Sequence, residues 1–330
     1  MKSRQNNIDF LKGILILLVV IGHFVQNNWI DSMEQHPIYN WIYSFHMAVF
    51  FFISGYLIQY TVKPDYRPLI EIKKRFLSMM LPYLSWVFLI GNITYKTMDF
   101  DISHLYNPHA AYWFVYVIFF FSVLFVGYHI CFSILSQKTK MNNIINEAIS
   151  VTCIIFVLLL CNLCVKSELF SRGIQFIPLY ILGFLSCKYK LTDYLIKNKL
   201  LLAFVTALFV ILSIQYNYDQ NLYFHKCLKL GIGVCASLSL FCVSKIMDIN
   251  YENTLIKLLC YAGKNSIVIY LTHFHLIKVF WEEAEWFNSF TSGWTFIISF
   301  FASVIICLAS LFIGKILETV PLLNRIVYGK

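Results

Sequence analysis

The sequence predicts an all-α polytopic membrane protein with about ten transmembrane helices and both termini in the cytoplasm. Three observations carry this prediction: the share of hydrophobic residues, the length of the apolar runs, and the distribution of lysine and arginine. Of 330 residues, 59% are hydrophobic and 13% are charged, whereas soluble domains have about 25% charged residues. A water-soluble domain of this size has too little interior to bury so much apolar surface.

Ten apolar runs have roughly the 17 to 25 residues that a helix needs to cross a bilayer. Helices are expected because the runs are continuous, with little alternation of polar and apolar residues. The first run lacks a small-residue cleavage site and is followed by many others, which argues against a removable signal peptide. The runs cover residues 10–27, 40–62, 78–95, 112–135, 147–165, 172–187, 199–215, 227–245, 263–281 and 294–314.

The basic residues give the orientation. Twenty of the 26 lysines and arginines fall in segments on one side of the predicted membrane, and the positive-inside rule assigns that side to the cytoplasm. The same bias accounts for the net charge of +9 without a nucleic-acid partner. The twenty are Lys2, Arg4, Lys12, Lys63, Arg67, Lys73, Lys74, Arg75, Lys138, Lys140, Lys188, Lys190, Lys197, Lys199, Lys245, Lys257, Lys264, Lys315, Arg325 and Lys330.

The rest of the composition predicts one membrane domain over residues 1–330, with no fused soluble domain. The ten cysteines lie in or beside apolar runs, which is typical of small buried thiols rather than a disulfide framework. The one C-x-x-C pair, Cys161 and Cys164, has no matching second pair. We therefore expect no metal site.

The first apolar run carries two ionisable residues that share one helix face. Lys12 and His23 are eleven positions apart, which places them within roughly 20° of each other and about 16 Å apart along the axis. Three alternatives stay open: Lys12 as a residue that extends to the headgroups, Asp9 as a helix N-cap, and His23 as a buried core histidine. An ionisable group this deep in a span is nevertheless a candidate functional residue.

The second run places His46 near the predicted depth of His23. A short connection makes the two helices antiparallel neighbours, so the two imidazoles are expected to approach each other near the outer face. Ser54 and Gly55 lie deeper in the same run. With Gly22, they are expected to allow close packing of the backbones.

Further candidates lie at the predicted membrane faces. Lys73, Lys74 and Arg75 form a basic cluster at the cytoplasmic start of the third run, suited to phosphates or simply to solvent. Pro82 is expected to bend that helix. At the outer face, Tyr112 and Trp113 begin the fourth run as ligand contacts or as interfacial belt aromatics. Arg172 begins the sixth run, and His273 lies near the middle of the ninth, on one face with Ser266 and Tyr270.

Four segments in this order resemble the membrane-bound acyltransferase 3 proteins, and more narrowly the fucose 4-O-acetylase-like branch. The first contains the Lys/Arg, ten residues, His pattern. With two shorter segments between them, the similarity runs over nearly the whole chain. The four are IDFLKGILILLVVIGHF, FHMAVFFFISGYLI, KKRFLSMMLPY and GKNSIVIYLTHF.

The resemblance implies a ten-helix enzyme of the bacterial cytoplasmic membrane. Such a protein moves an acyl group, usually acetyl, from cytoplasmic acetyl-CoA or another acyl-CoA to a hydroxyl of a cell-surface or lipid-linked glycan. It makes His23 the catalytic histidine, Lys12 its basic partner and Arg75 part of a basic motif. Many relatives have a second arginine three positions later, where this chain has Ser78.

We therefore predict an O-acyltransferase in which His23 acts as general base, with His46 orienting the base or the sugar. A covalent acyl-histidine route stays open. Lys12, Lys73, Lys74 and Arg75 are expected to hold acyl-CoA, with an extended pantetheine arm along the first helix. His46, Tyr112, Trp113, Arg172 and His273 are expected to contact the acceptor. A glycan or lipid-linked sugar transporter and a non-catalytic membrane partner or sensor are the alternatives; a transporter more often has an internal repeat, and none is found here.

Overall fold

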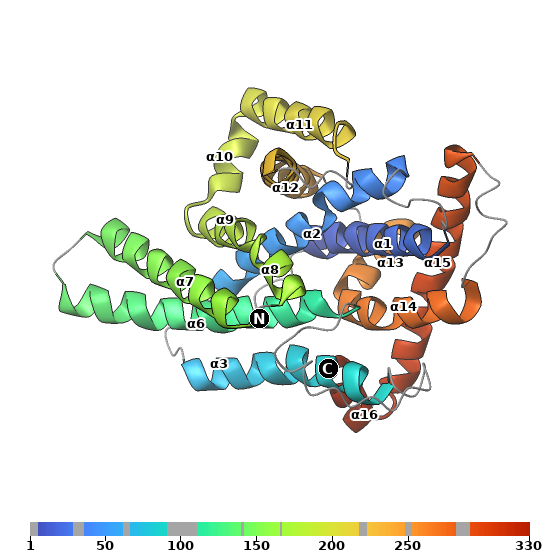
Figure 1. Cartoon of the computed structure of the whole chain (residues 1–330), viewed down its shortest axis with the longest axis horizontal. Helices are drawn as coiled ribbons and strands as arrows, with labels where there is room; N and C mark the ends of the chain where they lie inside the picture. Colours follow the sequence, from blue (N-terminus) through green and yellow to red (C-terminus); the bar gives the residue numbers. More distant parts are fainter. Residues whose placement is uncertain are drawn as a thin grey trace. The chain divides into compact units, whose positions relative to one another are not determined.

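The computed structural model describes residues 6–28, 36–61, 67–90, 111–139, 142–165, 167–217, 223–247, 253–281 and 291–330. All regular secondary structure within these ranges is helical, which confirms the predicted all-α class (Figure 1). The long elements are α1 (Asn6–Asn28), α2 (Pro37–Ile58), α6 (Trp113–Lys138), α7 (Asn143–Val165), α11 (Lys199–Ile214), α12 (Tyr223–Ile246), α14 (Ser266–Trp281) and α15 (Ser292–Leu317). The shorter ones are η2 (Gln59–Thr61), α3 (Pro68–Arg75), η3 (Phe76–Met80), α4 (Leu81–Ser85), η4 (Trp86–Ile90), α8 (Glu168–Ile174), α9 (Ile177–Lys188), α10 (Leu191–Lys197), α13 (Thr254–Lys264) and α16 (Pro321–Tyr328).

Six helices of the described chain are long and apolar enough to cross a membrane: α1, α2, α6, α7, α12 and α15. A seventh span is possible if α10 and α11, which meet at a bend of 105°, are taken together. The predicted runs 172–187 and 263–281 are instead divided between shorter helices, and run 78–95 extends into residues outside the described ranges. The structure thus confirms a polytopic membrane protein but not the count of ten spans.

The chain divides into two compact units. The first unit contains residues 1–59 and 179–317, and the second contains residues 60–178 and 318–330. The single domain over residues 1–330 stays a prediction.

In the first unit, α1 is the central helix and packs against α2, α12, α13, α14 and α15. Its closest approach is to α13, through two glycines. A Cβ added at Gly13 would overlap the backbone of Leu259, and one added at Gly263 would overlap the backbone of Asp9. The two helices therefore approach to a distance that only glycine permits, as in close small-residue packing between membrane helices.

A second glycine contact joins α2 to α9. A Cβ at Gly55 would overlap the backbone of Tyr180, and one at Gly183 would overlap that of Phe52. Gly55 thus allows close backbone packing, but against α9 and not, as expected, together with Gly22 against α1. Gly22 instead faces the side chains of Ile42 and Tyr43 on α2.

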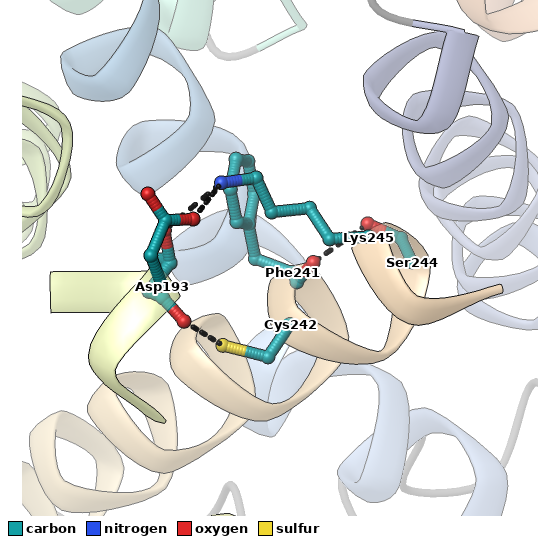
Figure 2. Close-up of polar contacts among 6 residues, drawn as sticks. Asp193, Phe241, Cys242, Ser244 and Lys245 are labelled. Carbon is teal, nitrogen blue, oxygen red and sulfur yellow. Dashed lines mark hydrogen bonds and ion pairs between the residues drawn. The ribbon is translucent and has the colours of Figure 1, made fainter. Parts of the chain in front are cut away.

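The short helix α10 is joined to the end of α12 by polar contacts (Figure 2). The Lys245 ammonium lies 3.0 Å from the Asp193 carboxylate and donates to the Thr192 hydroxyl at 3.2 Å. It also lies over the rings of Tyr56 and Phe241, at 5.6 and 5.7 Å. Because Asp193 is about half exposed, the ion pair itself contributes at most about 1 kcal/mol. Its effect is to keep α10 against α12 next to the 105° bend.

In the second unit, α6 and α7 pack together (Figure 1), and residues 68–90 form one helical path with two π-helical segments. The amide of Leu81 donates to the carbonyl of Phe76, which lengthens the turn just before Pro82. A wide turn relieves the clash between a proline ring and the preceding carbonyls. The structure thus has a π-helical turn directly before Pro82, and the bend expected there stays a prediction.

The C-terminal helix α16 packs on this path. The Ser85 hydroxyl donates to the carbonyl of Ile326, and the Trp86 indole donates to that of Val327, both at 2.9 Å. Gly329 has a left-handed backbone with φ of 70°, and a Cβ there would approach the backbone of Ser78. The end of the chain is thus held against the helix that follows the basic cluster.

Candidate active site

Two imidazoles from distant parts of the sequence meet inside the first unit. The Nδ1 atom of His23 on α1 lies 2.7 Å from the Nε2 atom of His273 on α14, which is hydrogen-bonding distance. The ring planes are parallel to within 9° and the centroids lie 5.0 Å apart, so the two rings meet edge to edge, as an N–H···N hydrogen bond requires. The sequence placed both residues within spans but predicted His46 as the neighbour of His23.

The position of α14 along α1, which brings these rings together, is set by the junction between α13 and α14. Gly263, near the end of α13, fits against the backbone of α1. One residue separates the two helices, and this residue, Asn265, donates its side-chain amide to the carbonyl of Tyr261 at 2.9 Å. His273 follows two turns later, so the α1–α13 contact fixes where α14 starts along α1.

His46 and His273 are each hydrogen-bonded to their own helix. The Nδ1 atom of His46 lies 2.6 Å from the carbonyl of Ile42, and that of His273 lies 2.8 Å from the carbonyl of Ile269. A carbonyl oxygen only accepts, so both Nδ1 atoms carry the proton. Each ring is thereby held in one orientation, with Nε2 directed away from its own backbone.

Aromatic side chains complete the surroundings of His23. The Tyr43 ring lies 6.4 Å from the His23 ring and 4.9 Å from that of His46, so it is a neighbour of both. Its hydroxyl donates to the Gln26 side chain at 3.0 Å. Phe274 meets the His23 ring edge to face at 5.8 Å. Sequence reasoning missed Tyr43, although its position three residues before His46 places it on the same helix face.

Of the three histidines, His23 is the most exposed. His46 is 3% exposed and His273 is fully buried, whereas His23 is half-buried. Lys12 is also partly exposed, but Ile16 and Val19, on the same stripe between the two, are 1% and 3% exposed. A pantetheine arm that runs along this stripe therefore requires the side chains covering Ile16 and Val19 to move apart.

The predicted basic cluster lies in the second unit, at the end of α3. Lys73 and Lys74 are exposed, and the Arg75 guanidinium forms an ion pair of 2.8 Å with Glu71 one turn earlier. The hydroxyl of Ser78, at the position of the missing second arginine, donates to the carbonyl of Arg75 at 3.3 Å. The cluster thus consists of two exposed ammonium groups and one guanidinium, which Glu71 holds in place.

The remaining predicted acceptor residues also belong to the second unit. Tyr112 is buried near the Trp86 ring, and Trp113 stacks on Phe176 with centroids 6.1 Å apart. Arg172 belongs to α8, but its side chain lies outside the described part of the structure. Within the described residues, no group of three or more His, Cys, Asp or Glu side chains has the geometry to hold a metal ion.

Comparison with known proteins places the chain in a family. Residues 5–312 match the family described as "Acyltransferase domain". Two relatives are nodulation proteins NolL: one from Sinorhizobium fredii, 30% identical over 146 residues, and one from Mesorhizobium japonicum, 29% identical over 137 residues. These matches cover 39% and 37% of this chain, and 38% and 35% of the relatives, so the chain spans well under half the length of either. No solved structure matches the chain. Since the family match covers most of its length, the protein belongs to the acyltransferase 3 family.

Proposed function

We propose that this protein is an integral membrane O-acyltransferase that moves an acetyl or other acyl group from cytoplasmic acyl-CoA to a hydroxyl of a cell-surface or lipid-linked glycan. The observation that carries the proposal is the half-buried imidazole of His23. It stands within a membrane helix and is hydrogen-bonded to a second buried imidazole. Family membership supports acyl transfer as the reaction.

In the proposed reaction, His23 acts as general base. A sugar hydroxyl is a weak nucleophile near neutral pH, and a neutral imidazole at hydrogen-bonding distance removes its proton as the oxygen attacks the thioester carbonyl. The new ester bond forms as the carbon–sulfur bond breaks. The proton held by His23 then passes to the leaving thiolate, which gives free CoA and returns the imidazole to its neutral form.

The donor is proposed to bind through its phosphates at the cytoplasmic basic residues. Lys73 and Lys74 are exposed, so their ammonium groups can reach phosphate oxygens of the donor. The guanidinium of Arg75 is oriented by its ion pair with Glu71. Arginine and lysine form their strongest hydrogen bonds with such charged oxygens. Lys12 is proposed as a further contact, near the cytoplasmic end of α1.

The acceptor is proposed to enter from the outer face, with His46, Tyr112, Trp113, Arg172 and His273 as the predicted contacts. Tyr43 joins this set because its ring adjoins both His23 and His46. Aromatic rings suit the apolar faces of sugars, the bare Nε2 of His46 can accept a hydrogen bond from a hydroxyl group, and Arg172 supplies donors.

The test measures acyl transfer by the purified protein in lipid. Its readout is the release of free CoA from acetyl-CoA in the presence of the glycan acceptor. His23→Ala is expected to reduce the rate by at least 100-fold, because general-base catalysis contributes about 10²- to 10⁴-fold. Insertion of the variant into the membrane, checked by its yield and its melting temperature, excludes loss of the protein. Full activity in this variant would remove His23 from the reaction.

Mass spectrometry of the surface polysaccharide, with and without the protein, identifies the acceptor. The expected difference is an acyl group on one sugar hydroxyl. A transporter predicts a change in the amount or location of a glycan. It also predicts that neither the native protein nor His23→Ala consumes the acetyl-CoA thioester.

A further inference from the structure

The hydrogen bonds around His273 determine which nitrogen of His23 is the base. His273 donates Nδ1–H to the carbonyl of Ile269, at 2.8 Å. In a neutral imidazole only one nitrogen carries a proton, so the Nε2 atom of His273 has a lone pair. The atom facing it at 2.7 Å, Nδ1 of His23, must then carry the proton that is shared between the two rings.

The consequence for His23 follows by the same rule. With its proton on Nδ1, the neutral ring has its lone pair on Nε2, the nitrogen on the opposite side from His273. His273 is fully buried, whereas His23 is half-buried. The basic nitrogen therefore belongs to the one residue of the three that is only partly buried.

We propose that His273 is a positioning residue that fixes the tautomer and orientation of His23, so that Nε2 of His23 is the proton-accepting atom. This inference rests on the proposed role of His23 as general base. A base held by a third group through its other nitrogen is a recurring arrangement in nucleophile activation. Here the third group is a neutral imidazole, which is less costly to bury within a membrane than a carboxylate would be.

The pair also accounts for the proton during the reaction. When Nε2 of His23 accepts the proton of the hydroxyl, His23 carries both N–H groups, and Nδ1–H still donates to His273. If that shared proton crosses the 2.7 Å gap, His273 becomes the cation, with one N–H directed to Ile269 and the other to His23. In either state, the N–H between the two rings has the other ring as its acceptor, and the Nδ1–H of His273 has the carbonyl of Ile269. The pair therefore stabilises the positive charge.

The first test reads the tautomer directly, without any acyl transfer. Solid-state nitrogen NMR on protein labelled at the histidine ring nitrogens, at a pH where the rings are neutral, distinguishes protonated from bare nitrogens. The signals of His23 are those that disappear in His23→Ala. We expect a protonated Nδ1 and a bare Nε2 in the native protein, and a mixture of tautomers in His273→Phe. A native His23 protonated on Nε2, or an unchanged tautomer in His273→Phe, would overturn the proposal.

The second test compares two replacements of His273. His273→Gln keeps an amide oxygen near the position of Nε2, whereas His273→Phe keeps the ring size and removes the acceptor. We expect His273→Phe to lower kcat by about 100-fold with the KM for acyl-CoA unchanged, and His273→Gln to keep kcat within about tenfold of the native value. Equal losses in both variants would show that the acceptor atom is not what matters.

The control for packing is His275→Phe, which removes a buried histidine two positions later on the same helix. It is expected to stay within a few-fold of native activity, and a loss as large as that of His273→Phe would assign the effect to the packing of α14. The NMR result is independent of activity. A failure of the proposed function, seen as full activity in His23→Ala, is therefore distinguishable from a failure of this inference.

Discussion

At the scale of single residues, several polar side chains in the described helices donate to a carbonyl of their own helix. Ser54, Ser122, Ser150 and Thr272 each donate to the carbonyl four residues earlier. His23 differs, because its Nδ1 partner comes from a helix 250 positions away. A polar side chain that depends on another helix links function to tertiary packing, and His36, which contacts Thr295, is a second residue of this kind.

Arg75 is expected to contribute to the affinity for acyl-CoA. Arg75→Ala should weaken binding about tenfold, because a hydrogen bond to a charged group contributes about 1.5–3 kcal/mol. Titration of CoA into the purified protein measures the change. Arg325→Ala is the matched control, since it removes an exposed arginine from the same unit. An unchanged affinity in Arg75→Ala would contradict its role in holding phosphates.

His36 is expected to make stability depend on pH. It precedes α2, its Nε2 atom lies 3.0 Å from the Thr295 hydroxyl, and burial lowers the pKa of the imidazole from its ordinary value of 6.5. The unfolded chain therefore takes up a proton more readily than the folded protein does. This contribution to stability is complete above pH 6.5 and is lost as the pH falls from there toward the lower folded-state pKa.

Melting temperatures of the detergent-solubilised protein between pH 7.5 and pH 5 measure this effect. The native protein should lose stability as the pH falls, and His36→Gln should lose less, since the glutamine does not titrate. An identical pH dependence in the two proteins would assign the loss to other groups.

At the scale of elements, glycine contacts set how closely the helices of the first unit approach. Gly13 and Gly263 bring α1 against α13, and Gly55 and Gly183 bring α2 against α9. The geometry of the His23–His273 pair depends on the first of these contacts, because one residue after α13 the chain enters α14, which carries His273. A change at Gly13 should therefore affect both stability and the pair of imidazoles.

Gly13→Ala is expected to destabilise the protein by about 2 kcal/mol, because the added methyl group overlaps a backbone rather than a movable side chain. Gly231→Ala is the matched control. No atom lies within 4 Å of a Cβ added there, and alanine favours the helix by about 0.5–1 kcal/mol. Thermal unfolding in detergent should show a lower melting temperature for the first variant and an unchanged or higher one for the second. Equal behaviour of the two would mean that α1 and α13 separate easily.

At the scale of the whole molecule, the distribution of charge predicts the orientation in the membrane. A protease-cleavable tag at either terminus should be protected in intact cells stripped of their outer layers and cleaved once the membrane is opened. A tag inserted near Asp101, in a predicted outer segment, should be cleaved in intact cells. Protection of the inserted tag together with cleavage of the terminal tags would reverse the proposed orientation.

Much of the fold was predictable because the bilayer imposes a simple rule. A continuous apolar run has to form a helix in lipid, so α1, α2, α6, α7, α12 and α15 appear near their predicted places. Runs 172–187 and 263–281 were harder, because hydropathy does not register a break inside an apolar stretch. Asn265, which separates α13 from α14, is one polar residue in such a stretch, yet its side chain ends one helix before the next begins.

The candidate site was predictable only in part. The cost of burying an ionisable group singled out Lys12, His23, His46 and His273, but no pattern in the sequence pairs His23 with His273. Helix periodicity gives the face on which a residue lies and its depth along one helix. It does not give the rotation and register of two helices that are far apart in the chain.

The sequence alone determined that the chain is helical, that it belongs in a membrane, and that a few histidines and basic residues are the candidates for chemistry. These properties follow from composition and local periodicity, which act within one segment at a time. Only the tertiary structure decided that α14, rather than α2, supplies the imidazole bonded to His23, and that His23 is the partly exposed residue of this pair. The physical reason is that helix register comes from backbone contacts such as those at Gly13 and Gly263, which exist only once distant segments have packed together.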